Sequence, residues 1–150
     1  MSERLNLGKS GADLYQAVVE LDRLVSRNLI SAGLAEGFSH LLRLRASQIN
    51  GCAFCVRLHA RDALANGESS DRLAVLAVWK ETDYFTLKER AALELVEAIT
   101  LISVDQLPDV IYEQAAEHLS TDEVSAIEWL AVVINTWNRI AISSRYPVKT

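Results

Sequence analysis

The chain has 150 residues, half of them hydrophobic, and 15 Lys and Arg against 20 Asp and Glu give a formal net charge of -5. This length suits one domain with its own core, and the negative charge argues against a footprint for nucleic acid or an anionic membrane. No apolar run approaches the roughly 20 residues needed to span a bilayer, and the first ten residues, MSERLNLGKS, contain no apolar signal core. We therefore expect one domain over residues 1–150 of a cytoplasmic protein, whose partners are small molecules or other proteins.

The first half of the chain reads as an arm followed by three helices. Residues 1–10 lack periodicity and are expected to form an N-terminal arm. Apolar residues then recur at helical spacing over 12–27, and a second helix is expected over about 35–49. Asn50 and Gly51 break that pattern, because both residues tolerate turn conformations. A third helix therefore begins at the cysteines that follow, and it ends near residue 66.

The second half continues in helices, and two of them carry an N-terminal signature. Thr86 with Glu89, and Ser120 with Glu123, have the spacing of a capping box. We expect helices over about 70–79, 86–99 and 108–119, and a longest, most apolar helix that includes 125–143.

No segment alternates in the manner of a strand, so the fold class is all-α. Short, interrupted helices favour a compact single-domain orthogonal bundle of about six to eight helices over a coiled coil. The last helix is apolar over more than one face, which indicates burial by this domain or by a neighbouring subunit and favours a homo-oligomer. Trp129 and Trp137 lie eight residues apart on it, and both are expected to pack in the core.

The segment with most chemistry is Asn50–His59, NGCAFCVRLH, which contains both cysteines of the chain. On a helix, Cys52, Cys55 and His59 would share one face. The helix N-terminus favours a thiolate at Cys52, whereas His59, four residues further on, can accept the proton of Cys55. These two arguments disagree about which sulfur is the nucleophile. A neighbouring thiol is useful in either case, because a sulfenic acid on one sulfur condenses with the other.

Two other interpretations compete with dithiol chemistry. A zinc site would need a fourth ligand, His40 or His118, beside Cys52, Cys55 and His59, and the usual second ligand pair is missing. We therefore expect neither a metal nor another cofactor. Alternatively, the cysteines pack as small core residues, which explains the apolar stripe but not why the only two cysteines lie beside a base.

Residues 41–69, LLRLRASQINGCAFCVRLHARDALANGES, resemble the core motif of the alkylhydroperoxidase AhpD-like branch of the carboxymuconolactone decarboxylase family. KERAALELVEAIT and INTWNRIAISSRYP resemble downstream segments of that family, so the resemblance covers nearly all of the chain from about residue 35. It implies an all-helical fold, assembly as trimers or hexamers, and a peroxiredoxin-type enzyme that reduces organic hydroperoxides or hydrogen peroxide. A decarboxylase-type lyase and a non-enzymatic, redox-sensing oligomeric module remain alternatives.

The resemblance also implies roles for individual residues. Cys55 would be the peroxidatic thiol activated by His59, and Cys52 would be the more accessible resolving thiol, with the disulfide reduced by an external dithiol or thiol protein. The family often has a glutamate twelve residues before the first cysteine, and here that position is His40. A histidine can relay protons near neutral pH. We therefore expect His40 to contact the region of His59 and Cys55 across the helix pair and to act with them.

Overall fold

The computed structural model describes residues 2–150, and within that range the chain is helical without a strand, which confirms the all-α class. Met1, the first residue of the expected arm, lies outside the described residues. The helices are α1 (Leu7–Ser10), α2 (Ala12–Ser31), α3 (Glu36–Asn50), α4 (Ala53–Ala65), α5 (Ser70–Val75), the 3-10 helix η1 (Leu76–Glu81), α6 (Leu87–Thr100), α7 (Ile102–Asp105), α8 (Asp109–His118) and α9 (Thr121–Ser143). None of these helices is both long and apolar enough to cross a membrane.

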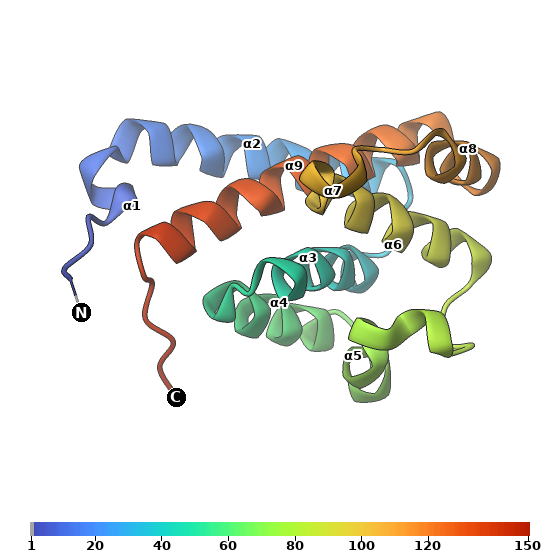
Figure 1. The fold of residues 1–150 in the computed structure, drawn as a ribbon, viewed down its shortest axis with the longest axis horizontal. Coiled ribbons are helices and arrows are strands. Elements are labelled where there is room, and N and C mark those ends of the chain that lie inside the picture. The colour runs from blue at the N-terminus through green and yellow to red at the C-terminus, as the bar shows by residue number, and fades with distance from the viewer. Residues whose placement is uncertain (1) are drawn as a thin grey trace.

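The long helix α9 organises the bundle (Figure 1). It packs against α2 along one side and against α3 and α6 on the other, while α4 lies along α3. The two ends of the chain lie on the same side of the molecule, where the backbone N–H of Leu7 donates to the Ser144 hydroxyl at 3.1 Å. The end of α3 and the start of α4 lie against the C-terminal half of α9.

The helix starts follow the local signals in the sequence. Both predicted capping boxes form: the hydroxyls of Thr86 and Ser120 accept from the backbone N–H groups of Glu89 and Glu123, whose carboxylates accept in return from the cap residues. Gly51 ends α3 in the left-handed conformation at φ 70°, which glycine adopts without steric cost.

Five sequence expectations need correction. The helix expected over 12–27 continues to Ser31, and the end of the helix expected over 70–79 is the 3-10 helix η1. The single-turn helix α7 was not expected at all, and Leu7–Ser10 forms another turn within the expected arm. Trp129, expected in the core, is 48% exposed. These differences depend on tertiary packing, which local sequence does not specify.

A polar network fixes the C-terminal end of α3 to α9. The Asn50 side-chain amide donates to the side-chain oxygens of Asn135 at 2.9 Å and of Asn138 at 2.8 Å. Fully buried Asn138 in turn donates to the Ser47 hydroxyl at 3.0 Å. Because these groups are satisfied only in this arrangement, the network holds in place the Asn50–Gly51 turn that leads into the cysteines.

The start of α3 lies tightly against the end of α4. A Cβ atom added to Gly37 would lie 2.7 Å from the carbonyl oxygen of Asn66, just beyond α4. Only glycine leaves room for this approach. The same helix pair carries His40 and His59, so the absence of a side chain at Gly37 helps to set the distance between them.

Candidate functional site

The two cysteines form a disulfide at the start of α4. Cys52 is the N-cap residue, and its sulfur accepts from the backbone N–H of Cys55 at 3.3 Å. Both sulfurs are buried, with Cys52 1% and Cys55 4% exposed, in a small apolar cluster with Ala141 and Tyr146. Neither cysteine is accessible in this disulfide state, and the greater accessibility of Cys52 stays a prediction.

An apolar cavity of about 250 Å³ reaches the disulfide through Cys55. Its walls come from α2, the start of α4, the end of α9 and the C-terminal tail. They comprise mostly aromatic and aliphatic side chains, namely Tyr15, Val19, Asp22, Phe54, Cys55, Leu58, His59, Trp137, Ala141 and Tyr146. Trp137 stacks edge-on against Tyr15 and donates from its indole N–H to Asp22 at 3.2 Å. The cavity thus has a defined apolar wall with Cys55 and His59 as its reactive groups.

His59 is the base of the motif, and it stands one turn after Cys55 on the same helix. Burial lowers the pKa of His59 to about 3, assisted by the positive charge of Arg43 and by neighbouring His40. The imidazole is therefore neutral at physiological pH and has a lone pair available to accept a proton.

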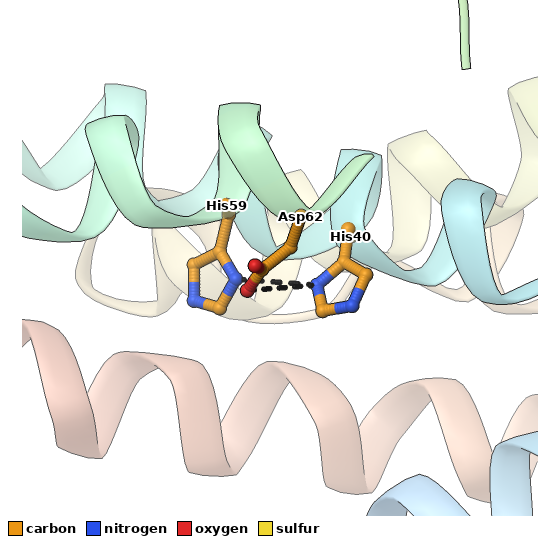
Figure 2. Close-up of side chains that lie close together, drawn as sticks. All are labelled: His40, His59 and Asp62. Atoms are coloured by element: carbon orange, nitrogen blue, oxygen red, sulfur yellow. Dashed lines mark hydrogen bonds and ion pairs between the residues drawn. The ribbon is translucent and has the colours of Figure 1, made fainter. Parts of the chain in front are cut away.

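His40 lies across the helix pair from His59, where the sequence places it (Figure 2). The two Nδ1 atoms are 3.4 Å apart, and His40 Nδ1 is 3.9 Å from a carboxylate oxygen of Asp62. Burial, with Arg43 nearby, lowers the pKa of His40 as well. Figure 2 shows the second ring nitrogen of His59 on the side of the ring away from His40. The Nδ1 atom of His59 thus contacts His40, while its Nε2 atom points away and can bind another group.

In this disulfide state the cysteine-based zinc site lacks its two thiolate ligands, although His40, one of the two candidates for the fourth ligand, does lie beside His59. The third histidine, His118, ends α8 and lines a different hollow with Trp79 and Arg90. Cys52 and Cys55 are joined to each other. Of the residues weighed as ligands or catalytic groups, the fold gathers Cys52, Cys55, His59 and His40.

Sequence reasoning missed the polar residues that surround the two histidines. Asp62 follows His59 by three residues, a spacing that puts both side chains on one helix face, so it could have been found. Arg43 follows His40 by three residues and could have been found in the same way, whereas Asp22 comes from α2 and meets the histidines only in the folded chain.

Comparison with known proteins places this fold and site in a family. Residues 12–98 match the carboxymuconolactone decarboxylase family. A crystal structure of ATU0492 from Agrobacterium tumefaciens, a protein of unknown function for which an antioxidant defence role of the AhpD type has been suggested, superimposes with a TM-score of 0.88 and 39% identity over 99% of this chain and 100% of that one. The chain belongs to the AhpD-like branch of the carboxymuconolactone decarboxylase family.

Two relatives are similar in sequence. The uncharacterized protein YdfG of Bacillus subtilis (strain 168) is 34% identical over 143 residues, which is 95% of each chain. The uncharacterized protein YnjA of Escherichia coli (strain K12) is 28% identical over 106 residues, 71% of this chain and 54% of its own length. Neither name states an activity.

Proposed function

We propose that the protein is a thiol peroxidase of the AhpD-like type, which reduces hydroperoxides through a Cys52–Cys55 dithiol–disulfide cycle and so serves in antioxidant defence. The observation that carries the proposal is the disulfide at the wall of an apolar cavity that His59 also lines. The suggested antioxidant role of ATU0492 agrees with it.

In the reduced protein, His59 accepts the proton of the Cys55 thiol, and the thiolate attacks the outer oxygen of the peroxide. A sulfur–oxygen bond forms, the oxygen–oxygen bond breaks, and the departing alkoxide takes a proton to leave as an alcohol. The Cys52 sulfur then attacks the sulfenic acid on Cys55, forming the disulfide and releasing water. A dithiol reductant restores both thiols by exchange.

The assignment of Cys55 as the attacking sulfur rests on position. Cys55 lines the cavity whereas Cys52 does not, and His59 lines the same cavity. Cys52, as the helix cap, lies within bonding distance of Cys55 on the buried side. Cys52 is therefore suited to resolve the sulfenic acid rather than to meet the substrate.

The lining of the cavity favours an organic hydroperoxide over hydrogen peroxide as substrate. Tyr15, Phe54 and Trp137 offer flat apolar surface to an alkyl or aryl group. Hydrogen peroxide would gain nothing from that surface. We expect a higher kcat/KM for cumene hydroperoxide than for hydrogen peroxide.

We further propose that the chain works as a homo-oligomer, a trimer or hexamer, as its AhpD-like character implies. Large apolar side chains exposed on several helices support this, among them Trp129 and Val132 on α9, at 48% and 46%. The reductant is a dithiol or thiol protein of unspecified identity.

The test measures turnover of cumene hydroperoxide with an excess of dithiothreitol as the donor. The Cys55→Ser variant is expected to lose activity, whereas Cys52→Ser is expected to form a sulfenic acid on Cys55 that a dimedone probe traps. Equal turnover by wild type and Cys55→Ser would reject the proposal. Activity on a carboxylated lactone that survives thiol alkylation would indicate a lyase, and one oxidation without turnover would indicate a sensor.

A further inference from the structure

A second cavity of about 240 Å³ adjoins the first at His59, and its chemistry differs from that of the first. His59, Leu58 and Asp22 line both cavities. The remaining walls of the second cavity are rich in polar and charged side chains, namely Ser26, Glu36, Ser39, His40, Arg43 and Asp62, beside Leu29 and Ile30. The peroxidase chemistry proposed above does not account for most of these groups.

Three side chains of the second cavity bring possible metal-ligand atoms close together. One atom each from His40, His59 and Asp62 lie within 4.8 Å of one another. The two Nδ1 atoms are 3.4 Å apart and His40 Nδ1 is 3.9 Å from Asp62 Oδ2, as the dashed lines in Figure 2 mark. Two ligand atoms bound to zinc at about 2.1 Å in tetrahedral geometry stand about 3.4 Å apart. The separation of the two Nδ1 atoms equals that value, and the Asp62 carboxylate would have to move closer to complete the tetrahedral set.

A separate observation indicates that something polar belongs in this cavity. Ser39 is buried, with 3% of its surface exposed. Within residues 2–150, its hydroxyl is the single buried side-chain polar atom without a hydrogen-bond partner. Ser39 lines the same cavity as His40 and Asp62. An orphaned buried hydroxyl is costly, and a water or hydroxide bound to an ion would satisfy it.

The local charge also favours a cation. Asp22, Glu36 and Asp62 bring three carboxylates to the cavity, against the single guanidinium of Arg43. Arg43 is partly neutralised by Asp22 at 4.0 Å, and its guanidinium donates to Ser26 at 3.0 Å. By formal charge the cavity wall is therefore negative, while the positive charge of Arg43 acts on both histidines.

We propose that His40, His59 and Asp62 form a binding site for a divalent transition metal ion of the zinc class, with the fourth position filled by a water that hydrogen-bonds to Ser39. Two imidazole nitrogens and one carboxylate oxygen suit Zn²⁺ or Co²⁺ better than Mg²⁺ or Ca²⁺, which prefer oxygen. The ligands stand on the tightly packed pair α3 and α4, so they are held in position before an ion arrives.

One consequence rests on the proposed function. An ion on Nδ1 of His59 would leave the hydrogen of the neutral imidazole on Nε2, so the ring would have no free lone pair to accept the proton of Cys55. Binding would thus slow activation of the Cys55 thiol. The site would make peroxidase turnover sensitive to free zinc.

The first experiment uses the full chain in its disulfide form, so that no thiolate can bind the ion. Chelator-treated protein is titrated with Co²⁺, followed by visible absorption, and with Zn²⁺ by calorimetry. One ion per chain is expected. His40→Ala and Asp62→Asn should weaken binding at least about 10-fold, since even the loss of an outer-shell partner costs about 10–100-fold.

Two matched variants serve as controls. His118→Ala removes the histidine outside the cluster, and Glu36→Gln removes one charge from the same cavity wall without removing a proposed ligand. His118→Ala should bind with the affinity of wild type, and Glu36→Gln should lose much less affinity than Asp62→Asn. Equal binding by wild type and Asp62→Asn, or equal loss in Glu36→Gln and Asp62→Asn, would overturn the site. Circular dichroism establishes that each variant is folded.

The second experiment measures peroxide turnover against zinc concentration, with each variant normalised to its own zinc-free rate. The proposed site predicts that Asp62→Asn needs at least about 10-fold more zinc for half inhibition than wild type. Equal sensitivity would mean that zinc acts through the thiolates and would refute the inhibitory role. If the protein has no turnover, the proposed function fails while the titration of the disulfide form still decides the metal site.

Discussion

His40 stands where the resemblance to AhpD-like proteins implies a glutamate, and its contact with His59 gives that difference a physical meaning. A glutamate would supply fixed negative charge, whereas a neutral imidazole supplies a donor and an acceptor. In this chain the nearby carboxylate is that of Asp62, whose Oδ2 lies 3.9 Å from His40 Nδ1. A negative charge is thus present beside His40 and His59, but Asp62 supplies it instead of residue 40.

We expect His40→Ala to lower the rate of Cys55 oxidation by about 10-fold, because His59 loses the ring that lies 3.4 Å from its Nδ1 and orients it. The measurement is stopped-flow oxidation of the reduced protein by cumene hydroperoxide across pH, in the presence of a chelator. His118→Ala is the control and should keep the wild-type profile. An unchanged rate and pH profile in His40→Ala would remove His40 from the mechanism.

Much of the site could be predicted from residue types and spacing. The pairing of two cysteines with His59 is a local pattern, and its chemistry follows from thiol reactivity. The inward orientation of Cys52 could not be predicted, because it depends on Ala141 and the C-terminal tail packing over the cap. Ser39 carried no signal, since its unpaired hydroxyl matters only once the cavity around it exists.

At the scale of helices, local sequence signals determine where α6 and α9 begin, whereas tertiary contacts determine how far helices extend and how they pack. The capping boxes at α6 and α9 were predictable because each is complete within four residues. The change from α5 to η1, the single turn α7 and the exposure of Trp129 were not, because they reflect how neighbouring helices meet. The sequence therefore predicts the order of helices better than their packing.

The close approach of α3 and α4 predicts the effect of a small substitution. Gly37→Ala places a Cβ 2.7 Å from the backbone oxygen of Asn66, which cannot move without shifting the end of α4. We expect a loss of about 1–3 kcal/mol in the free energy of unfolding, measured by urea titration. Gly11→Ala, whose Cβ meets atoms no nearer than 3.5 Å, is the matched control. Equal midpoints for the two variants would contradict this account.

The start of α9 predicts a dependence of stability on pH. Burial acts to raise the pKa of Glu123, but hydrogen bonds from Lys88 and Ser120 outweigh it and lower the pKa below its usual 4.5. The carboxylate therefore stabilises the fold above the unfolded-state pKa, and this contribution is lost as pH falls through the lower folded-state pKa.

Glu123→Gln should accordingly cost about 1 kcal/mol of unfolding free energy at pH 7. The difference from wild type should shrink as the pH is lowered below 4.5. Urea unfolding at a series of pH values measures it. Glu113→Gln, at an exposed position in α8, is the control and should show no such difference. A pH-independent deficit would assign the effect to packing instead.

At the scale of the whole molecule, the exposed apolar residues of α9 bear on assembly. Trp129 and Val132 are three residues apart on one face of the helix and are about half exposed in the single chain. We expect light scattering to give a mass that is a trimer or hexamer multiple of 16.6 kDa. Trp129→Asp should shift this mass downwards with the helical circular dichroism unchanged. A wild-type monomer at all concentrations would refute the oligomer.

The position of Trp137 has an optical consequence. Its indole lines the cavity that Cys55 also lines, whereas Trp79 is buried against Glu97 and Trp129 faces outward. Disulfides quench indole emission by accepting an electron from the excited ring, and free thiols do so less. Reduction of the Cys52–Cys55 bond should therefore brighten the emission of Trp137, and the Trp137→Phe variant should lose that change. The protein thus contains a fluorescent reporter of its own redox state.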